Sequence, residues 1–356
     1  MTAPAHRRRS FTLIEMLIVM TIMAIIATLI YGAMEMAQRS AREAKTKATI
    51  AKLHRIIMTK WESYRTRRVP LDPATYAKSS GFYTAYLAYL QGGTPTTSVN
   101  KDLARLKLNA LRDLMRMELP DRWSDVVYNP SSPSATDSST TGTNSPVLVN
   151  KSGVGLGQPA LSQRYAAKFT SAANTVGIAA SSPIWQYPGA KCLYMIVMSD
   201  PDDAAQFQAD EYGDYTGDRL PVFLDGWHRP IQFLRWPAGF IPANNADSNL
   251  QSGNATTDPD PFDPMKVFGE YAIYPLIYSC GANPQRDSSG QFRSDINLGK
   301  TGSGSAVYSY SLTGSGDLNP YAADGAGFLI GQPLAPNGTG TPQHLQNIHN
   351  QRLEVR

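Results

Sequence analysis

Glu15 is the ionisable side chain with the most unusual surroundings near the start of the chain. It lies inside Phe11 to Tyr31, FTLIEMLIVMTIMAIIATLIY, a stretch that is otherwise apolar or uncharged and that follows Arg7, Arg8 and Arg9. A charged side chain costs about 2.5–3.5 kcal/mol at the centre of a bilayer and less near its edge, and such residues commonly pair with a defined group. The pattern therefore predicts a specific partner for this carboxylate.

A purely local role for Glu15 is also open. Thr12 and Glu15 have the S/T-x-x-E spacing of a capping box, in which each side chain bonds a backbone amide at the start of a helix. The residues alone leave both interpretations standing.

The apolar stretch is long enough to cross a membrane. About 20 residues at about 1.5 Å each span the hydrocarbon core as a helix. The arginines on its amino side predict a cytoplasmic N-terminus, with the remainder of the chain across the membrane. A secretory signal has a shorter apolar core and a cleavage site, whereas this helix continues into Arg39 and Arg42. We expect a single-pass anchor that is not cut after the span.

The sequence RRRSFTLIE, followed by an apolar helix, resembles the class III leader of type IV pilins and pseudopilins. The resemblance implies that a prepilin peptidase cuts between Ser10 and Phe11 and methylates the new amino group of Phe11. It also gives Glu15 the family's fifth-position glutamate role, whose partner is the mature amino group of a neighbouring subunit. Ser10 departs from the glycine that is usual before the cut.

Helical spacing of small and apolar residues predicts that this helix continues to about Arg65, before Pro70 and Pro73. The positions concerned are Ala37, Ala41, Ala44, Ala48 and Ala51, then Ile50, Leu53, Ile57, Trp61 and Tyr64. A helix from Phe11 to Arg65 measures about 80 Å, far more than a bilayer, so its second half should dock on a globular domain.

Further helices are predicted at 76–90, 101–117, 163–173 and 190–198, with a short one near His344, and an exposed loop at 131–145. The acidic stretch 200–218 lacks the spacing of a calcium-binding EF-hand loop, so we expect a solvated surface. Its carboxylates are Asp202, Asp203, Asp210, Glu211 and Asp214. The prolines among Asp258, Asp260 and Asp263 predict an extended loop.

A second resemblance lies at 224–239, LDGWHRPIQFLRWPAG, where turns at Gly226 and Pro230 precede a predicted strand or hairpin carrying Ile231, Phe233 and Trp236. The segment is similar to the D-P-W-G-x-P-Y-x-Y segment of the major pseudopilin of type II secretion. The matching residues are Asp225, Trp227, Pro230 and Phe233. The following segment 274–283, YPLIYSCGAN, is similar to the family's strand ending in Y-S-x-G-A-D, and Asp295-Ile296 is similar to the A-D-I after the next loop.

The resemblance implies that the loop between these matches binds calcium. Asp287 and Asp295 would supply carboxylates and Ser279 a carbonyl or hydroxyl, whereas Asn283 stands where aspartate is common. Two carboxylates with backbone carbonyls could supply part of the 6–8 oxygens that calcium takes. A glycine- and serine-rich turn without metal is the alternative.

The remaining residues predict no chemistry beyond packing. The formal charge of +4 falls to +1 once the three leader arginines are removed, so we expect no nucleic-acid partner. Cys192 and Cys280 could form a disulfide or remain separate buried thiols. HExxH, GxSxG and P-loop motifs are absent from the sequence, and His344 and His349 lack i, i+4 metal spacing, so we expect no enzyme.

These patterns predict an α+β fold: a long N-terminal transmembrane and stem helix packed on a globular head with a small antiparallel β-sheet and a large, mostly helical and loop insertion. The resemblance implies the ladle shape of pilins. The predicted parts are a leader at 1–10, the membrane or assembly half of the helix at 11–31, its exposed stem half at 32–68, an inserted helical and loop region at 69–223, and a β-rich pseudopilin-like region with a polar tail at 224–356.

The function implied is that of a structural subunit. The precursor would sit in a bacterial inner membrane with its head in the periplasm and assemble into a periplasmic filament for type II-type secretion. Its partners would be the prepilin peptidase, other pseudopilin subunits, the inner-membrane assembly platform and membrane lipid. The alternatives are a type IV pilus subunit, and a periplasmic enzyme or binding domain with a pilin-like anchor.

Overall fold

The computed structural model describes residues 12–69, 92, 97–126, 159–177, 182–282, 284, 286, 291–292, 294–298, 319–321, 323, 327–334 and 343–352. The predicted leader, the helix predicted at 76–90 and the loop predicted at 131–145 lie outside these residues.

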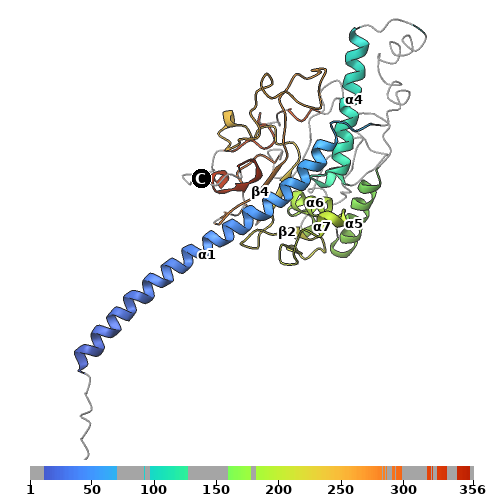
Figure 1. Cartoon of the computed structure of the whole chain (residues 1–356). Helices are drawn as coiled ribbons and strands as arrows, with labels where there is room; N and C mark the ends of the chain where they lie inside the picture. Colours follow the sequence, from blue (N-terminus) through green and yellow to red (C-terminus); the bar gives the residue numbers. More distant parts are fainter. Residues whose placement is uncertain are drawn as a thin grey trace, which may run out of the picture.

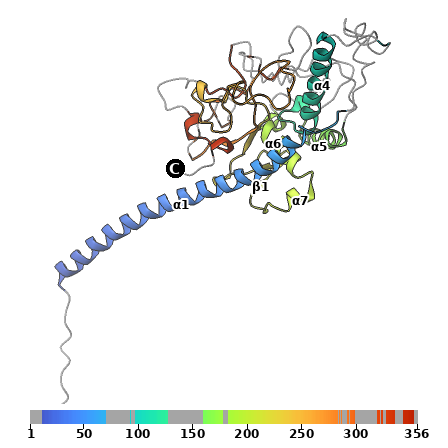
Figure 2. The same cartoon turned by 45° about the horizontal axis from the view of Figure 1, so that its top comes forward.

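The first element is one uninterrupted helix, α1 (Leu13–Ser63), of 51 residues. At about 1.5 Å per residue it measures about 77 Å, which confirms the predicted continuation beyond the apolar stretch. Thr12 caps its start and Tyr64 its end. Figures 1 and 2 show its first half extending away from the head and its second half lying against it.

The docked half of α1 supplies part of the core. Its buried side chains recur about once per turn, some as adjacent pairs, and form one stripe, as expected for a helix with one covered face. They are Thr46, Thr49, Ile50, Leu53, Ile56, Ile57 and Trp61.

The head contains four more described helices, and those predicted at 101–117, 163–173 and 190–198 are confirmed with slightly different ends. They are α4 (Thr97–Glu118), α5 (Ala160–Val176), α6 (Pro188–Val197) and the short α7 (Pro201–Ala204). The described residues also contain five 3-10 turns: η1 (Trp123–Asp125), η2 (Pro183–Trp185), η3 (Pro242–Asn244), η4 (Gln343–Gln346) and η5 (Asn350–Arg352). The short helix predicted near His344 is η4.

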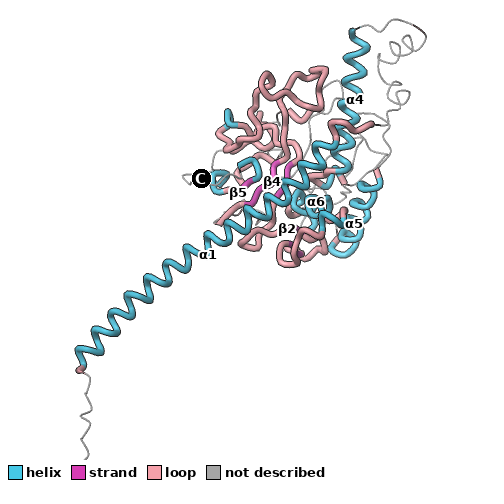
Figure 3. The backbone as a smooth tube through the Cα atoms, in the orientation of Figure 1, coloured by secondary structure: helices cyan, strands magenta, loops and turns pink. Residues whose placement is uncertain are grey.

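Two small antiparallel sheets complete the described part of the head, which is otherwise mostly loop (Figure 3). One pairs β1 (Tyr212–Gly213) with β2 (Val222–Phe223). The other has the order β3-β4-β5, from β3 (Gln232–Leu234), β4 (Leu276–Ser279) and β5 (Ile348–His349). In it Phe233 lies opposite Ile277, and Ser279 opposite Ile348. These features establish the α+β fold.

Both α1 and α6 pack on the face of the three-stranded sheet that carries Phe233 and Ile277. The docked half of α1 packs on β4 and β5, while α6 packs on β2 and β3. The approach of α6 to β3 is very close, because a Cβ on Gly189 would lie 2.5 Å from the carbonyl oxygen of Phe233. One hydrophobic cluster runs from Leu53 through Leu193 to Ile277. Residues on both sides of the boundary predicted between 223 and 224 therefore share a core.

Buried charges are numerous in the head, and many of them form ion pairs. Arg235 Nη1 donates to Asp125 Oδ2 at 2.9 Å, and Arg116 Nε donates to Asp125 Oδ1 at 2.9 Å. Burial alone would raise the pKa of Asp121, but the guanidinium groups of Arg122 and Arg235 outweigh it and lower that pKa. These contacts fasten α4 and η1 to the end of β3.

A separate pair, Lys191 and Asp218, is fully buried. Lys191 Nζ donates to Asp218 Oδ2 and, at 2.8 Å, to the carbonyl oxygen of Pro183. Burial lowers the pKa of Lys191, and the carboxylate of Asp218 opposes that shift. The pair joins α6 to the loop before β2.

Because this pair is buried, we expect Asp218→Ala to lower the stability of the fold strongly. The change leaves the Lys191 ammonium buried without its counter-charge, so the free energy of unfolding should fall by about 3–5 kcal/mol. Asp202→Ala, at an exposed position in the same acidic stretch, is the matched control and should change it by no more than about 0.5 kcal/mol. Denaturant unfolding of the full chain in detergent measures both. Equal stabilities of the two variants would contradict the assigned role of the pair.

Candidate functional site

The apolar half of α1 is uncovered on every side. Its large hydrophobic side chains from Leu13 to Met36 are between 49% and 85% exposed. The helix is long and apolar enough to cross a membrane, and its most apolar window is outside the head's core. A helix that is hydrophobic all round requires lipid or other helices around it. This half of α1 is therefore a surface that the chain does not cover itself.

Glu15 lies at the N-terminal end of this surface and forms the predicted capping box. Its Oε2 accepts from the backbone nitrogen of Thr12 at 2.8 Å and from Thr12 Oγ1 at 3.0 Å. In return, the backbone nitrogen of Glu15 donates to Thr12 Oγ1 at 3.3 Å. The carboxylate is exposed and lies within four residues of the position of the implied cut. Ser10 and Phe11 are outside the described residues, and the assembly role of Glu15 stays a prediction.

At the other end of the surface, the head contacts α1 through the turn at Asp225. This carboxylate is 2% exposed and its Oδ1 accepts from the backbone nitrogens of Trp227 at 2.8 Å and Arg229 at 2.9 Å. Its Oδ2 accepts from Ser279 Oγ at 2.6 Å. Burial raises the pKa of Asp225, although these donors act against the shift. One side chain thus joins the two segments that resemble the major pseudopilin.

Gly226 brings this turn into direct contact with α1. Its backbone nitrogen donates to Thr46 Oγ1 at 2.9 Å, while the Thr46 hydroxyl donates to the carbonyl oxygen of Arg42 at 2.8 Å. A Cβ on Gly226 would lie 2.2 Å from that same carbonyl oxygen. The absence of a side chain at residue 226 therefore sets how closely the head approaches the helix.

Glu211 forms a second, buried attachment to α1. Its Oε1 accepts from Thr49 Oγ1 at 3.0 Å, and Lys52 Nζ contacts both carboxylate oxygens at 2.9 Å. Burial alone would raise the pKa of Glu211, but its hydrogen bonds and Lys52 lower it. The prediction of a solvated surface at 200–218 is therefore wrong for Glu211, which is 6% exposed, and for the fully buried Asp218. Asp203 is half-buried, and Asp202, Asp210 and Asp214 are exposed.

The C-terminal segment forms the third attachment. Asn350 Oδ1 accepts from the backbone nitrogen of Ile277 at 2.8 Å, and its Nδ2 donates to the carbonyl oxygen of Pro275 at 2.9 Å. The same Nδ2 lies 2.9 Å from His54 Nδ1 on α1. A Cβ on Gly281 would lie 2.3 Å from the carbonyl oxygen of Gln346, so the tail also packs tightly after β4.

Two of the residues predicted to bind calcium lie in the described part of the chain and have other partners. The Ser279 hydroxyl donates to Asp225, and the carbonyl oxygen of Asp295 accepts from the backbone nitrogen of Leu334 at 2.8 Å. Asp287 and Asn283 lie outside the described residues. Arg229 Nη1 donates hydrogen bonds to the carbonyl oxygens of Gly281 at 2.6 Å and Ala282 at 2.9 Å. Within the described ranges no three His, Cys, Asp or Glu side chains come together as metal ligands, and calcium binding stays a prediction.

The two cysteines are separate buried thiols that no disulfide joins, which decides between the two alternatives. Burial raises the pKa of Cys280 to about 12.

Sequence reasoning missed the polar residues that attach α1 to the head. Thr46 and Thr49 stand three residues apart in the alanine-rich part of the helix, and this spacing on the docked face was the available signal. Nothing in the sequence pointed to their partners, because Gly226 and Glu211 lie more than 150 residues further along the chain.

The contact at Gly226 predicts that Gly226→Ala weakens the packing of the head against α1. The added Cβ must push the turn away from α1, and overpacking of this kind costs about 1–3 kcal/mol. Gly213→Ala is the control, since its Cβ would only reach Leu224 Cδ1 at an ordinary 3.5 Å. Thermal unfolding of the full chain in detergent should show a lower Tm for Gly226→Ala alone. A Tm equal to that of the control would show that the turn moves without cost.

His349 predicts acid sensitivity of the fold. It is 6% exposed and, within the described part of the chain, its Nδ1 has no hydrogen-bond partner. Burial lowers the pKa of His349 to about 4 from an ordinary 6.5, so below pH 6.5 the unfolded chain binds a proton that the folded chain does not. Stability should fall by about 1.4 kcal/mol per pH unit between pH 6.5 and 4. Denaturant unfolding across this pH range should show a smaller loss of stability for His349→Gln than for the wild type. If stability fell equally with pH in both, another group would be responsible for the acid sensitivity.

Comparison with protein families places a known motif on the segment that contains Glu15. Residues 5–31 match the family model described as the prokaryotic N-terminal methylation motif. No curated protein and no solved structure matches the chain. The match covers the leader arginines, Glu15 and most of the exposed half of α1, and it leaves the head outside. The chain thus carries a prepilin-type methylation motif on a helix that is long and apolar enough to cross a membrane, which is consistent with the type IV pilin-like family.

Proposed function

We propose that this chain is a pseudopilin-like subunit that is cut between Ser10 and Phe11 and assembles through α1 into a periplasmic filament. The observation that carries this proposal is the contrast along α1. Its first half is apolar and exposed all round, while its second half is fixed to the head by Gly226, Glu211 and Asn350. A rigid head on a helix that can exchange lipid for neighbouring helices is what a filament subunit requires.

The contacts in the head favour a pseudopilin over a subunit of a true pilus. The segments 224–239 and 274–283, which resemble the major pseudopilin, are hydrogen-bonded through Asp225 and Ser279 and paired as β3 and β4. They form part of the surface through which the head contacts α1. A type II-type secretion machine is therefore the proposed setting, with the inner-membrane assembly platform and other pseudopilins as partners.

The proposed mechanism is packing rather than catalysis. In the membrane, the N-terminus faces the cytoplasm, as the leader arginines favour, and the head lies in the periplasm. On assembly, the apolar half of α1 leaves lipid and packs against neighbouring stems. Glu15 then receives the methylated amino group of a neighbouring Phe11, and its charge is neutralised in an apolar environment.

The capping box allows the charge of Glu15 to be separated from its local role. Glu15→Gln keeps an amide that can still bond the Thr12 backbone, because glutamine serves in capping boxes, but it removes the charge. Thr12→Ala removes the cap and keeps the carboxylate. We expect Glu15→Gln to insert into the membrane and to be cut normally. Its incorporation into the filament should fall at least about tenfold, because a charged pair away from water is lost. Thr12→Ala should still assemble.

Cross-linking between copies in cells measures incorporation, and mass spectrometry of the N-terminus reports the cut in each variant. Normal incorporation of Glu15→Gln would rule out the charge pairing. If neither Glu15→Gln nor Thr12→Ala were incorporated, the role of Glu15 would be limited to capping the start of α1. An uncut wild-type chain would refute the proposed function itself.

A further inference from the structure

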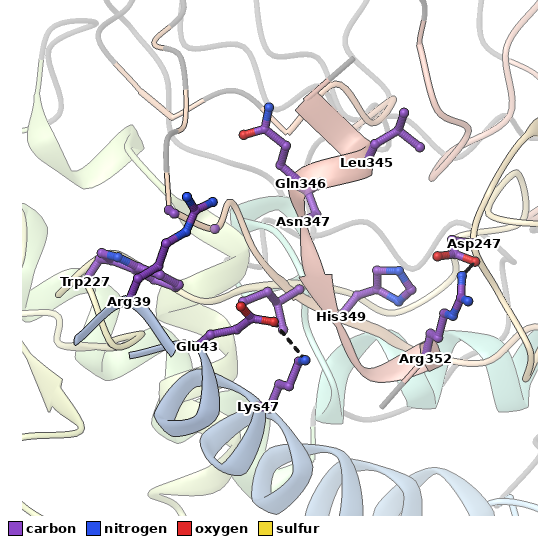
Figure 4. Close-up of a pocket in the computed structure, with 13 residues that line it drawn as sticks. Arg39, Glu43, Lys47, Trp227, Asp247, Leu345, Gln346, Asn347, His349 and Arg352 are labelled. Carbon is purple, nitrogen blue, oxygen red and sulfur yellow. Dashed lines mark hydrogen bonds and ion pairs between the residues drawn. The ribbon is translucent and has the colours of Figure 1, made fainter. Parts of the chain in front are cut away.

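A cavity of about 440 Å³ opens where α1 enters the head. It lies between the first docked turns of α1 and the C-terminal segment, as Figure 4 shows. The residues that matter for its chemistry are Arg39, Lys47, Trp227, Leu345 and Arg352. Of these five, Trp227 was described above, where its backbone nitrogen bonds Asp225.

The lining carries one positive charge that the described residues do not balance. Lys47 Nζ pairs with Glu43 at 2.8 Å, and Arg352 pairs with Asp247 (Figure 4). Arg39 is exposed, and its guanidinium forms no ion pair or hydrogen bond with any residue in the described ranges. The cavity therefore favours a ligand with a single negative charge.

The lining also has an apolar part. Leu345 is 60% exposed and Trp227 is half-buried at the cavity wall. An indole ring beside a cationic side chain is typical of the boundary between lipid and water, where tryptophan is enriched. The cavity can thus receive a molecule that is charged at one end and apolar at the other.

The position along α1 places this cavity near the membrane surface. Twenty residues from Leu13 end at Gly32 and span the hydrocarbon core of about 30 Å. Arg39 follows seven residues later, about 10 Å further along the axis, while each headgroup layer is about 5–8 Å thick. Side chains on a helix incline toward its N-terminus, and arginine extends back toward the interface, so the guanidinium can reach the lipid phosphates.

We propose that this cavity binds the headgroup of an anionic glycerophospholipid from the leaflet below the head. Arg39 contacts the phosphodiester, and Trp227 and Leu345 contact the glycerol and the first acyl carbons. The inference rests on the membrane-anchored state in the proposed function and adds a lipid site to it. A bound headgroup would hold the head against the membrane until α1 is withdrawn.

The test uses the full-length chain in detergent, titrated with dioleoyl-phosphatidylglycerol and, separately, dioleoyl-phosphatidylcholine, with bound lipids counted by native mass spectrometry. The variant is Arg39→Gln. Arg42→Gln is the matched control, because Arg42 is also exposed and lies only about 4.5 Å further along α1 but does not line the cavity. Inorganic phosphate is added as a competitor to separate a lipid site from a simple phosphate site.

We expect the wild type and Arg42→Gln to retain one phosphatidylglycerol that phosphate does not displace, and Arg39→Gln to bind it about tenfold more weakly. Equal affinities of Arg39→Gln and Arg42→Gln would overturn the proposal. So would equal binding of the two lipids, displacement by phosphate, or a second copy of the chain occupying the cavity in place of lipid. Membrane flotation of the same variants tests anchoring separately, so a failed lipid site is distinguishable from a failed anchor.

Discussion

The close approach of the turn at Gly226 to α1 is the contact on which the rest of the head depends. Asp225 shapes that turn through two backbone amides and, through Ser279, ties it to β4. β4 is the central strand of its sheet and lies on α1, so the position of the turn fixes the sheet and the helix together. A longer side chain at residue 226 would disturb all of these contacts at once.

Much of the helical architecture could be predicted because its signals are local. The length of α1 followed from an unbroken apolar stretch and then a stripe at helical spacing, and the capping box followed from two residues three apart. The strands gave weaker signals, because strands of two to four residues are too short to show an alternation of apolar and polar side chains. Glu211 was placed at the surface because it stands in an acidic stretch, whereas its partner Lys52 is 159 residues away.

The short strands stand beside many buried charges in the head. A sheet with few ladder hydrogen bonds offers little directional constraint on the elements around it. Arg235 supplies such constraint by bonding both Asp125 and the carbonyl oxygen of Leu119, which holds η1 and α4 in one orientation to β3. Buried ion pairs add little stability over apolar packing, so their main contribution here is to favour one arrangement over others.

The two roles of Glu15 follow from the environment of its carboxylate. In the isolated chain the carboxylate accepts hydrogen bonds from the backbone nitrogen and the hydroxyl of Thr12 in a capping box. In water an ion pair with a neighbouring amino group gains little and is screened by salt, so it offers little advantage over these hydrogen bonds. Away from water the same pair is much stronger, and leaving the charge without a counter-ion is costly. Exchange of Thr12 for a neighbour's amino group is therefore favourable only inside an apolar medium, so the proposed assembly step belongs in the bilayer or the packed core of a filament.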